Sequence, residues 1–543
     1  MAAGKDEVTP LLGHHGHIST DGHNSRCSIQ QRCKTMTTRR WVCYAILIVL
    51  ALVLVLSGLI GIPYMMSAIY KWVINTMMVL DPSSPLFVEW ETPNIPMFQS
   101  FYFFDIQNPE EFKAGGRPNV IERGPYVYKL GFDRPNLTFH DNDTLSFYPR
   151  YFYSFDEEKS AGPETDRFIT LNMPLVTVAY FVRNAGPLVQ IPANALMEML
   201  GERLTLNLTV EELLWGYDEP LFKLIQPIIN IPGYDQGKFG FLMSFNYTTL
   251  NLYTVNTGKE NQTLLNDVVN FQGLPDLSWW GTPETNEILG TDGTMYHPYL
   301  TREENMHLFH PDLCRSVPYV YEQDTIYKKV PLLKFVLANY TYSNGTDYPP
   351  NAGFCSHDQD LCGPSGIMRQ DPCRFGSPSA ISNPHFFQGD PALYEAVGGL
   401  NPQAKYHQHY MEVEPLMGMP YVLKMRLQIS MITLQLPRIT EMKNVRNMAM
   451  PVLWFEQSVE ADDRIVGYYE TGFVLTAYIA LIVKWIMFSI GLLMCVLTVV
   501  SCGKRLAHPP VGSSEEKNEK IINASPESSC DSGSVNVAVT EDA

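Results

Sequence analysis

The chain has 543 residues, of which 45% are hydrophobic and 18% charged, and its formal net charge is −18 at pH 7. This acidic balance argues against nucleic-acid binding, which needs basic patches, and against broad electrostatic docking on anionic membranes. A polar stretch of ~400 residues lies between two apolar segments, and it is long enough to bury a large core.

The N-terminal tail carries one sharp motif. Glu7 is followed, after three further residues, by Leu11 and Leu12. Clathrin adaptors read this pattern, because a basic patch meets the carboxylate while an apolar pocket takes the two leucines. The motif is short, and a chance match is the alternative. We expect a clathrin adaptor to bind this tail.

Two apolar segments predict membrane spans. Residues 41–70 carry no charge, and neither do residues 485–503, whose apolar lead-in begins at Phe473. Each is long enough, because ~20 apolar helical residues cross a bilayer core. The expected organisation is a tail over 1–40, a span over 41–65, an ectodomain over 66–475, a span over 476–502 and a tail over 503–543.

The flanking charges predict the orientation. Arg39 and Arg40 precede the first span, and Lys504 and Arg505 follow the second. Short flanks rich in Lys and Arg stay in the cytosol, so the ectodomain is expected to be luminal or extracellular. The sequon at Asn523 would then stay unmodified. Seven sequons for N-glycosylation lie in the ectodomain, at Asn136, Asn142, Asn207, Asn246, Asn261, Asn339 and Asn344.

The ectodomain reads as a β-rich body interrupted by helices. Short aromatic and β-branched runs separated by turn residues predict strands, at residues 101–106, 126–130, 145–148, 151–155 and 421–430. Between about 174 and 229 the spacing becomes helical, with a capping box formed by Thr209 and Glu212. This cluster is expected to project from the body as a cap.

Four cysteines lie in the ectodomain, Cys314, Cys355, Cys362 and Cys373. An even number in an oxidising compartment predicts two disulfides, for which three pairings exist. The simplest is a local Cys355–Cys362 bond nested inside a Cys314–Cys373 bond.

No motif for catalysis holds. The sequence lacks the nucleophile elbow, the P-loop, the zinc-protease helix and the dinucleotide fingerprint. We therefore expect no enzyme activity, no cofactor and no metal site. His407 and His409 are interpreted as surface groups.

Several longer motifs resemble the class B scavenger receptor family, and the likeness runs from the first span to the second. They are Ile121–Tyr128 (IERGPYVY), Glu212–Tyr217 (ELLWGY), Gly290–Pro298 (GTDGTMYHP), Asn351–Cys355 (NAGFC), Pro384–Phe386 (PHF) and Glu414–Gly418 (EPLMG). The resemblance implies an α+β fold: a large antiparallel β-barrel-like ectodomain with a helical apex at about 174–229, anchored by the two terminal helices. It also implies the nested disulfide pairing.

The resemblance further implies a function. Members bind lipids or lipoproteins at the apex, here the region that includes Arg183, Met197, Leu200 and Arg203, and conduct fatty acid or sterol through an apolar tunnel to the membrane. The alternative is a lysosomal sorting receptor whose apex binds a luminal protein. We expect a multi-pass protein of the lysosomal or endosomal membrane, the plasma membrane, or both, and a homo-oligomer is compatible with the likeness.

Overall fold

The computed structural model describes residues 25–229, 237–243, 245–249, 251–355 and 362–507. The chain divides into two compact units. The membrane unit consists of Met1–Met66 and Ala477–Ala543, and the body consists of Ser67–Thr476.

Two long helices make up the described part of the membrane unit. The first is α1 (Ser25–Leu56), a π-helical turn (Ser57–Gly61) and the start of α2 (Ile62–Met77), and the second is α13 (Thr476–Ala507). Two stretches are long and apolar enough to cross a membrane, Thr38–Met77 and Asp463–Lys504. The predicted spans at both ends of the chain therefore correspond to helices of the required length.

Glycines bring these two helices into close contact. A Cβ atom added to Gly58 would lie 3.0 Å from the backbone oxygen of Lys484, and one added to Gly491 would lie 2.8 Å from that of Ala51. Gly58 and Ala51 are both buried. Small residues allow membrane helices to approach at backbone distance, so the two spans pack as an antiparallel pair.

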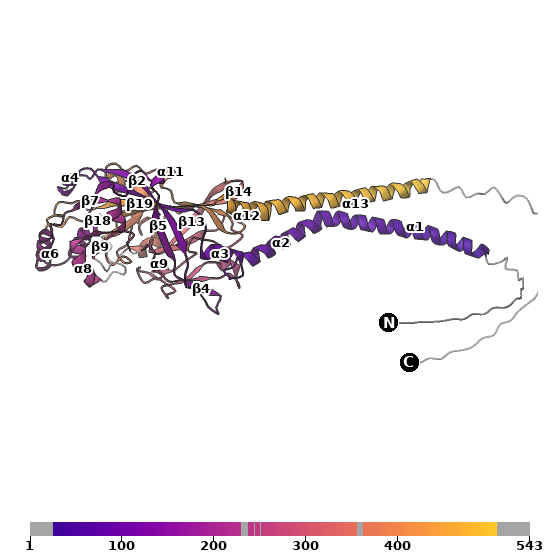
Figure 1. The fold of residues 1–543 in the computed structure, drawn as a ribbon, viewed down its shortest axis with the longest axis horizontal. Coiled ribbons are helices and arrows are strands. Elements are labelled where there is room, and N and C mark those ends of the chain that lie inside the picture. The colour runs from indigo at the N-terminus through magenta and orange to yellow at the C-terminus, as the bar shows by residue number, and fades with distance from the viewer. Residues whose placement is uncertain (1–24, 230–236, 244, 250, 356–361, 508–543) are drawn as a thin grey trace, which may run out of the picture. The chain divides into compact units, whose positions relative to one another are not determined.

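The body is built on one large antiparallel sheet (Figure 1). Its order is β12 (Met306–His310), β13 (Arg315–Tyr327), β14 (Val330–Leu337), β17 (Tyr410–Glu414), β18 (Met419–Thr433), β19 (Met448–Glu460), β1 (Met97–Ile106), β2 (Val120–Asp133) and β5 (Arg150–Phe155), with β16 (Ser379–Ser382) paired to β18 and β15 (Met368–Arg369) to β16. Within the described residues no ladder joins β12 to β5, so hydrogen bonding leaves the sheet open rather than closed into a barrel.

Three smaller sheets and short helices complete the body. The sheets are β11 (Val268–Phe271), β10 (Tyr253–Asn256), β4 (Thr144–Phe147) and β3 (Thr138–Phe139); β6 (Arg167–Leu171) with β7 (Thr205–Thr209); and β8 (Tyr217–Asp218) with β9 (Lys238–Phe239). The helices are α3 (Pro85–Glu91), α4 (Pro109–Lys113), α5 (Met173–Phe181), α6 (Pro187–Met199), α7 (Val210–Trp215), α8 (Pro220–Ile229), α9 (Pro283–Asn286), α10 (Pro391–Glu395), α11 (Ala404–His407) and α12 (Asp463–Tyr469).

Most predicted elements occur, with shifted ends. The runs at 101–106, 126–130, 151–155 and 421–430 lie inside β1, β2, β5 and β18. The capping box of Thr209 and Glu212 is present at the start of α7. Helix α6 begins at Pro187, because a proline at the first helical position has its backbone already set for a helix.

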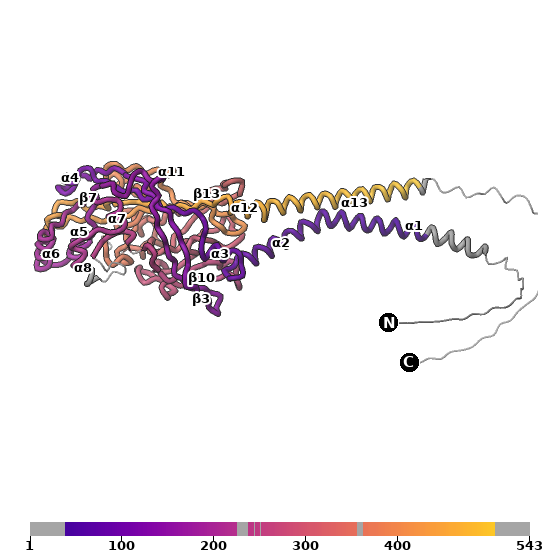
Figure 2. The backbone as a smooth tube through the Cα atoms, in the orientation of Figure 1, coloured from indigo at the N-terminus to yellow at the C-terminus, as the bar shows by residue number. Residues whose placement is uncertain are grey.

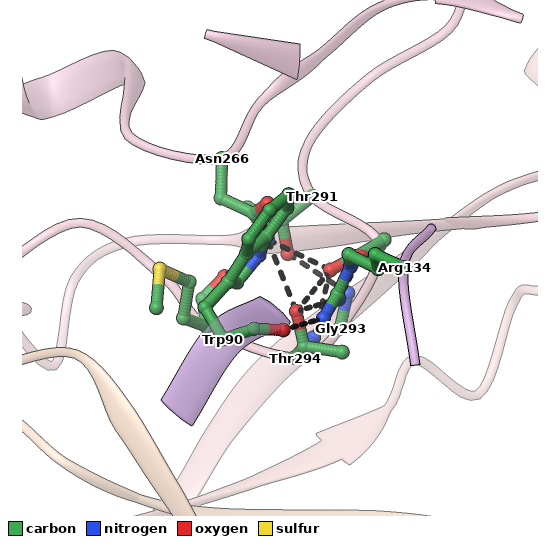
Figure 3. A network of polar contacts seen from close by, with 8 residues as sticks. Trp90, Arg134, Asn266, Thr291, Gly293 and Thr294 are labelled. Atoms are coloured by element: carbon green, nitrogen blue, oxygen red, sulfur yellow. Dashed lines mark hydrogen bonds and ion pairs between the residues drawn. The ribbon is translucent and has the colours of Figure 1, made fainter. Parts of the chain in front are cut away.

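A buried arginine connects the end of β2 to α3 and to the segment Gly290–Pro298 (Figure 3). The Arg134 guanidinium, at the end of β2, lies 2.8 Å from the Asp292 carboxylate and 4.1 Å from the centre of the Trp90 ring. Asn266 donates from its amide nitrogen to Asp292 at 2.7 Å and accepts from the Trp90 indole at 3.3 Å. Thr294 accepts a further bond from Arg134 at 2.9 Å. The motif Gly290–Pro298 thus supplies the counter-charge for a buried cation.

Two disulfides are present in the body. Cys314 is bonded to Cys373, 59 residues away, and Cys355 is bonded to Cys362. The second bond is nested in the loop closed by the first, which is the pairing that the family resemblance implies.

Candidate ligand-binding surface

Helices α5, α6 and α8, here called the apical helices, lie at the end of the body opposite α12 (Figure 2). The short sheet of β6 and β7 connects them to the main sheet. The ring of Phe168 on β6 stacks on that of Phe103 on β1, with 4.6 Å between their centres. The apical region therefore rests on the central strands rather than on a flexible tether.

The loop between β18 and β19 forms three hydrogen bonds to side chains of α6. Arg438 donates to the side-chain oxygen of Gln190 at 3.1 Å. Thr440 donates from its hydroxyl to Glu198 at 2.6 Å and from its backbone nitrogen to Asn194 at 2.7 Å. These three bonds fix the rotation of α6 about its own axis, and so decide which of its side chains face outward.

The outward face of α6 is apolar. Leu188 is 92% exposed, Ile191 60% and Met199 76%, and together with exposed Ala195 they follow helical spacing along one face. We call these four residues the apolar stripe. Gln190, by contrast, is buried and donates to the backbone oxygens of the turn that follows α5. The first half of α6 therefore has inverted amphipathicity, because its polar side chain faces inward and its apolar ones face solvent.

The four residues named from the sequence for this region lie in different environments. Met197 is only 2% exposed and packs in the core, so it supports α6 from within and presents no surface to a ligand. Leu200 is half-buried against the same core. The Arg183 guanidinium lies 3.6 Å from the centre of the Tyr180 ring. Arg203 has a 71% exposed side chain, 3.6 Å from the carboxylate of Glu441.

The apolar stripe was not among the sites predicted from the sequence. The one available signal was Leu188-Val-Gln-Ile191, a polar residue set among apolar ones directly after Pro187. From the sequence alone, this pattern predicts a helix that buries its apolar side chains. The contacts of Gln190 in the structure show the opposite orientation, with Gln190 facing inward and the apolar side chains facing outward.

A buried pair of carboxyl groups joins the apical helices. Glu202, after α6, and Glu219, which precedes α8, are 8% and 3% exposed, and the pKa of Glu219 responds to the nearby Glu202 carboxyl group. Glu202 accepts from the side chain of Asn172 at 2.8 Å, and Asn172 caps α5 through Leu175. Glu219 accepts from the backbone nitrogen of Phe222 in the first turn of α8. Burial, together with the neighbouring Glu202, raises the pKa of Glu219 to about 8. The hydrogen bonds that Glu202 and Glu219 accept therefore tie these two carboxyl groups to the starts of α5 and α8.

A second cluster has the composition of a metal site, with ligand atoms of Glu122, His385 and His407 within 4.8 Å of one another. The hydrogen bonds of His385 and His407, however, do not fit metal binding. Backbone nitrogens donate to Nδ1 of His385 and to Nδ1 of His407, each at 3.0 Å. Because Nδ1 accepts in each ring, the ring proton lies on Nε2, and Nε2 of His385 lies 2.6 Å from Glu122. A metal-bound histidine normally donates from its other nitrogen, so these residues do not fit one.

The structure corrects the expectation that His407 and His409 are surface groups. His407 and His409 are buried, not surface groups, at 5% and 2% exposed. Burial lowers the pKa of His407 to about 4 and that of His409 to about 3. The rings of His407 and His385 stack with 4.3 Å between their centres. His407 and His409 therefore stay neutral and act as packing groups.

The remaining sequence-derived sites are distributed over the surface or fall outside the described residues. The side chains of Asn136, Asn142, Asn207, Asn261 and Asn339 are exposed, and those of Asn246 and Asn344 are half-buried. The adaptor motif of Glu7, Leu11 and Leu12 lies outside the described residues, as does Asn523.

Comparison with known proteins agrees with the motifs. A family model described as the CD36 family matches residues 48–502. Scavenger receptor class B member 1 of Bos taurus is 32% identical over 451 residues, which cover 83% of this chain and 87% of the relative. The protein of the same name in Cricetulus griseus is 33% identical over 461 residues, covering 85% of this chain and 89% of the relative.

A second group of relatives matches almost as much of the chain. Lysosome membrane protein 2 of Homo sapiens is 30% identical over 438 residues, which cover 79% of this chain and 88% of the relative. The residues matched by the family model span the body and reach into both membrane helices. The resemblance to class B scavenger receptors is therefore confirmed, and the chain belongs to the CD36 family.

Proposed function

We propose that this membrane protein is a non-enzymatic lipid receptor, which captures lipids or lipoprotein particles at its apical helices. The observation that carries the proposal is the apolar stripe, where Leu188 is 92% exposed while Gln190 is buried. Exposed apolar surface of this kind marks an interaction site for an apolar partner. Relatives whose names call them scavenger receptors support the receptor class.

Binding through the stripe is tested by making it polar. Burial of each apolar side chain in a ligand contributes ~2 kcal/mol, so replacing Leu188, Ile191 and Met199 together by Ser should weaken lipoprotein binding by at least ~10-fold. Ile326→Ser is the matched control, because Ile326 is 78% exposed on the hairpin of β13 and β14. Equal binding by the triple variant and the control would refute the apical site.

We further propose that captured lipid, such as fatty acid or sterol, passes along an apolar tunnel through a barrel-like body to the anchoring membrane. The family resemblance supports this route. Protein interiors normally pack at near-crystalline density, so a continuous apolar channel is stable only when lipid fills it. Purified protein should therefore carry fatty acid or sterol, detected by mass spectrometry of solvent extracts. Lipid-free extracts would contradict the conduit and leave apical binding untouched.

The proposed orientation places the body in the lumen or outside the cell and both tails in the cytosol. The body would then carry N-glycans, and the tail motif of Leu11 and Leu12 would meet a clathrin adaptor. Enzymatic deglycosylation should lower the apparent mass, whereas Asn523→Gln should leave it unchanged. An unshifted band would overturn this topology.

A sorting receptor is the second candidate function. Its support is the likeness to a lysosome membrane protein and the acidic dileucine motif of the tail. In that case the apolar stripe would bind a luminal protein and carry it to lysosomes. The triple serine variant separates the two functions, because a sorting receptor would lose delivery of the luminal protein while cellular lipid uptake stayed normal.

A further inference from the structure

The hairpin of β13 and β14 extends beyond its neighbours in the main sheet. Strand β12 pairs with β13 only as far as Tyr319, and β17 pairs with β14 only from Leu333. From Asp324 to Leu332, the two strands therefore pair with each other alone among the described residues. We call residues 324–332 the hairpin tip. An isolated two-stranded ribbon is at best marginally stable in water, so the position of the tip depends on what it packs against.

One face of the hairpin tip packs on α12, beside which β14 lies in Figure 1. Val330 is fully buried in a cluster that includes Val466 of α12. The amine of Lys328 lies 2.6 Å from the carboxylate of Asp463, the first residue of α12. Asp463 is also the first residue of the second stretch that is long and apolar enough to cross a membrane. The hairpin tip is therefore held where the chain enters this stretch.

The opposite face of the hairpin tip exposes apolar side chains. Ile326 is 78% exposed, and Pro331, its partner across the hairpin, is exposed as well. Side chains of directly paired residues lie on the same face of a ribbon, so the two form one apolar surface. On α12, Tyr468 is 61% exposed, and tyrosine is enriched where a membrane meets water. The end of the body at which α12 lies therefore presents apolar and interfacial side chains to its surroundings.

The turn of the hairpin tip consists of two lysines in an unfavourable backbone conformation. Lys328 and Lys329 have φ values of 45° and 71°. A two-residue turn of this type normally takes Asn and Gly, because other side chains are strained there. Both lysines are exposed. The turn thus combines local strain with two positive charges at the end of an apolar surface, a combination that turn formation alone does not explain.

The second span is longer than a bilayer requires. Residues 473–503 carry one charge, that of Lys484. As one helix they extend ~46 Å, at ~1.5 Å per residue, whereas the hydrocarbon core of a bilayer is ~30 Å thick. A span longer than the core tilts. A tilted span brings one side of the residues that precede it towards the lipid headgroups, and the hairpin tip is bound to those residues through Asp463.

We propose that the hairpin tip contacts the headgroup layer of the bilayer that anchors the protein. Ile326 and Pro331 enter the apolar boundary of this layer, while the amine of Lys329 donates to phospholipid phosphates. The long apolar stem of a lysine allows its amine to reach the phosphates while the stem lies along the apolar side chains. This third contact, in addition to the two spans, limits the angle between the body and the bilayer. It lies at the end of the body opposite the apical helices and is independent of the apolar stripe.

Photo-crosslinking tests which molecule lies against the hairpin tip. Benzoylphenylalanine replaces Ile326 in the full-length protein, which is placed in nanodiscs of phosphatidylcholine and phosphatidylserine and irradiated. Mass spectrometry should find phospholipid adducts at position 326. Ile121 is the matched control position, because it is 52% exposed and its strand partner Asp105 accepts a hydrogen bond from Ile169 of β6, near the apical helices. No phospholipid adduct at 326, adducts to protein peptides there, or equal lipid adducts at the two positions would overturn the proposal.

A lysine variant tests the charge. Lys329→Asn should leave the melting temperature in detergent unchanged or raise it, because Asn tolerates a positive φ, yet it should lower the yield of lipid adduct at position 326 about 5-fold. Lys443→Asn is the control, since Lys443 is exposed in the loop that bonds to α6, and it should keep the full yield. An equal yield in both variants would overturn the role of Lys329 and, with it, the proposal. No lipoprotein is present in either experiment, so the outcome is separate from capture at the apical helices.

Discussion

The guanidinium of Arg134 lies 2.8 Å from the carboxylate of Asp292, and the two residues are 158 positions apart in the chain. Both side chains are enclosed, at 0% and 10% exposed. Asp292 belongs to the longest of the motifs that indicated the family. That motif therefore has a structural explanation, because its acidic residue neutralises a cation at the centre of the body.

Asp292→Asn should destabilise the body severely. The substitution leaves Arg134 buried without its counter-charge, and breaking a buried ion pair from one side costs ~3–5 kcal/mol. The free energy of unfolding, from denaturant titration of purified protein, measures this loss. Asp324→Asn is the control, because the side chains of the Arg302–Asp324 pair are 57% and 56% exposed, and solvent screening leaves such a pair with little effect on stability. Similar losses in the two variants would contradict the structural role of the motif.

The carboxyl pair at the apex predicts a pH dependence with a definite sign. The pKa of Glu219 is raised in the folded state to about 8, from an ordinary value of 4.5. The folded state then binds more protons than the unfolded state between these values. The stabilising contribution is complete below pH 4.5 and is lost as the pH rises through 8, by at most ~1.4 kcal/mol per pH unit.

Glu219→Gln should flatten this dependence, because the amide resembles the protonated acid at every pH. Melting temperatures between pH 5 and 8.5 provide the measurement. Glu198→Gln is the control: this apical carboxylate has a lowered pKa owing to hydrogen bonds from Thr440 and Asn194, so it titrates below that window. If Glu219→Gln keeps the slope of the unmodified protein, the titration of Glu219 is not the cause of the pH dependence.

Gly491→Leu should separate the two membrane helices, since a Cβ atom at this position would lie 2.8 Å from the backbone oxygen of Ala51. Spin labels on the exposed positions Leu50 and Val496 would report the separation by pulsed electron resonance. The distance should increase in Gly491→Leu and stay the same in Gly503→Leu, because nothing lies within 4 Å of a Cβ at Gly503. An unchanged distance in the first variant would show that the helices do not depend on this contact.

The two disulfides should differ in their contribution to stability. Loss of the Cys314–Cys373 bond, which spans 59 residues, should cost ~4 kcal/mol in the chain-entropy model, and loss of the Cys355–Cys362 bond, which spans 7, only ~2.5 kcal/mol. Cys314→Ser should therefore be retained in the endoplasmic reticulum more strongly than Cys355→Ser. Normal delivery of Cys314→Ser would show that the outer bond is dispensable.

The sequence by itself determined the features that depend on local composition. An apolar run of ~20 residues spans a bilayer whatever the rest of the chain does, so both membrane helices were predictable. The same holds for the capping box of Thr209 and Glu212, whose bonds join residues three apart. The strand runs were predictable because alternation and turn residues are local signals.

The tertiary structure alone decided which side chains of the apical region face outward. Burial of Gln190 depends on Arg438, 248 residues further along the chain, and burial of Met197 depends on the same packing. Long-range contacts also brought Glu202 to Glu219 and buried His407 and His409. No local pattern encodes these facts, because the free energy of burying a side chain is set by the segments that pack over it.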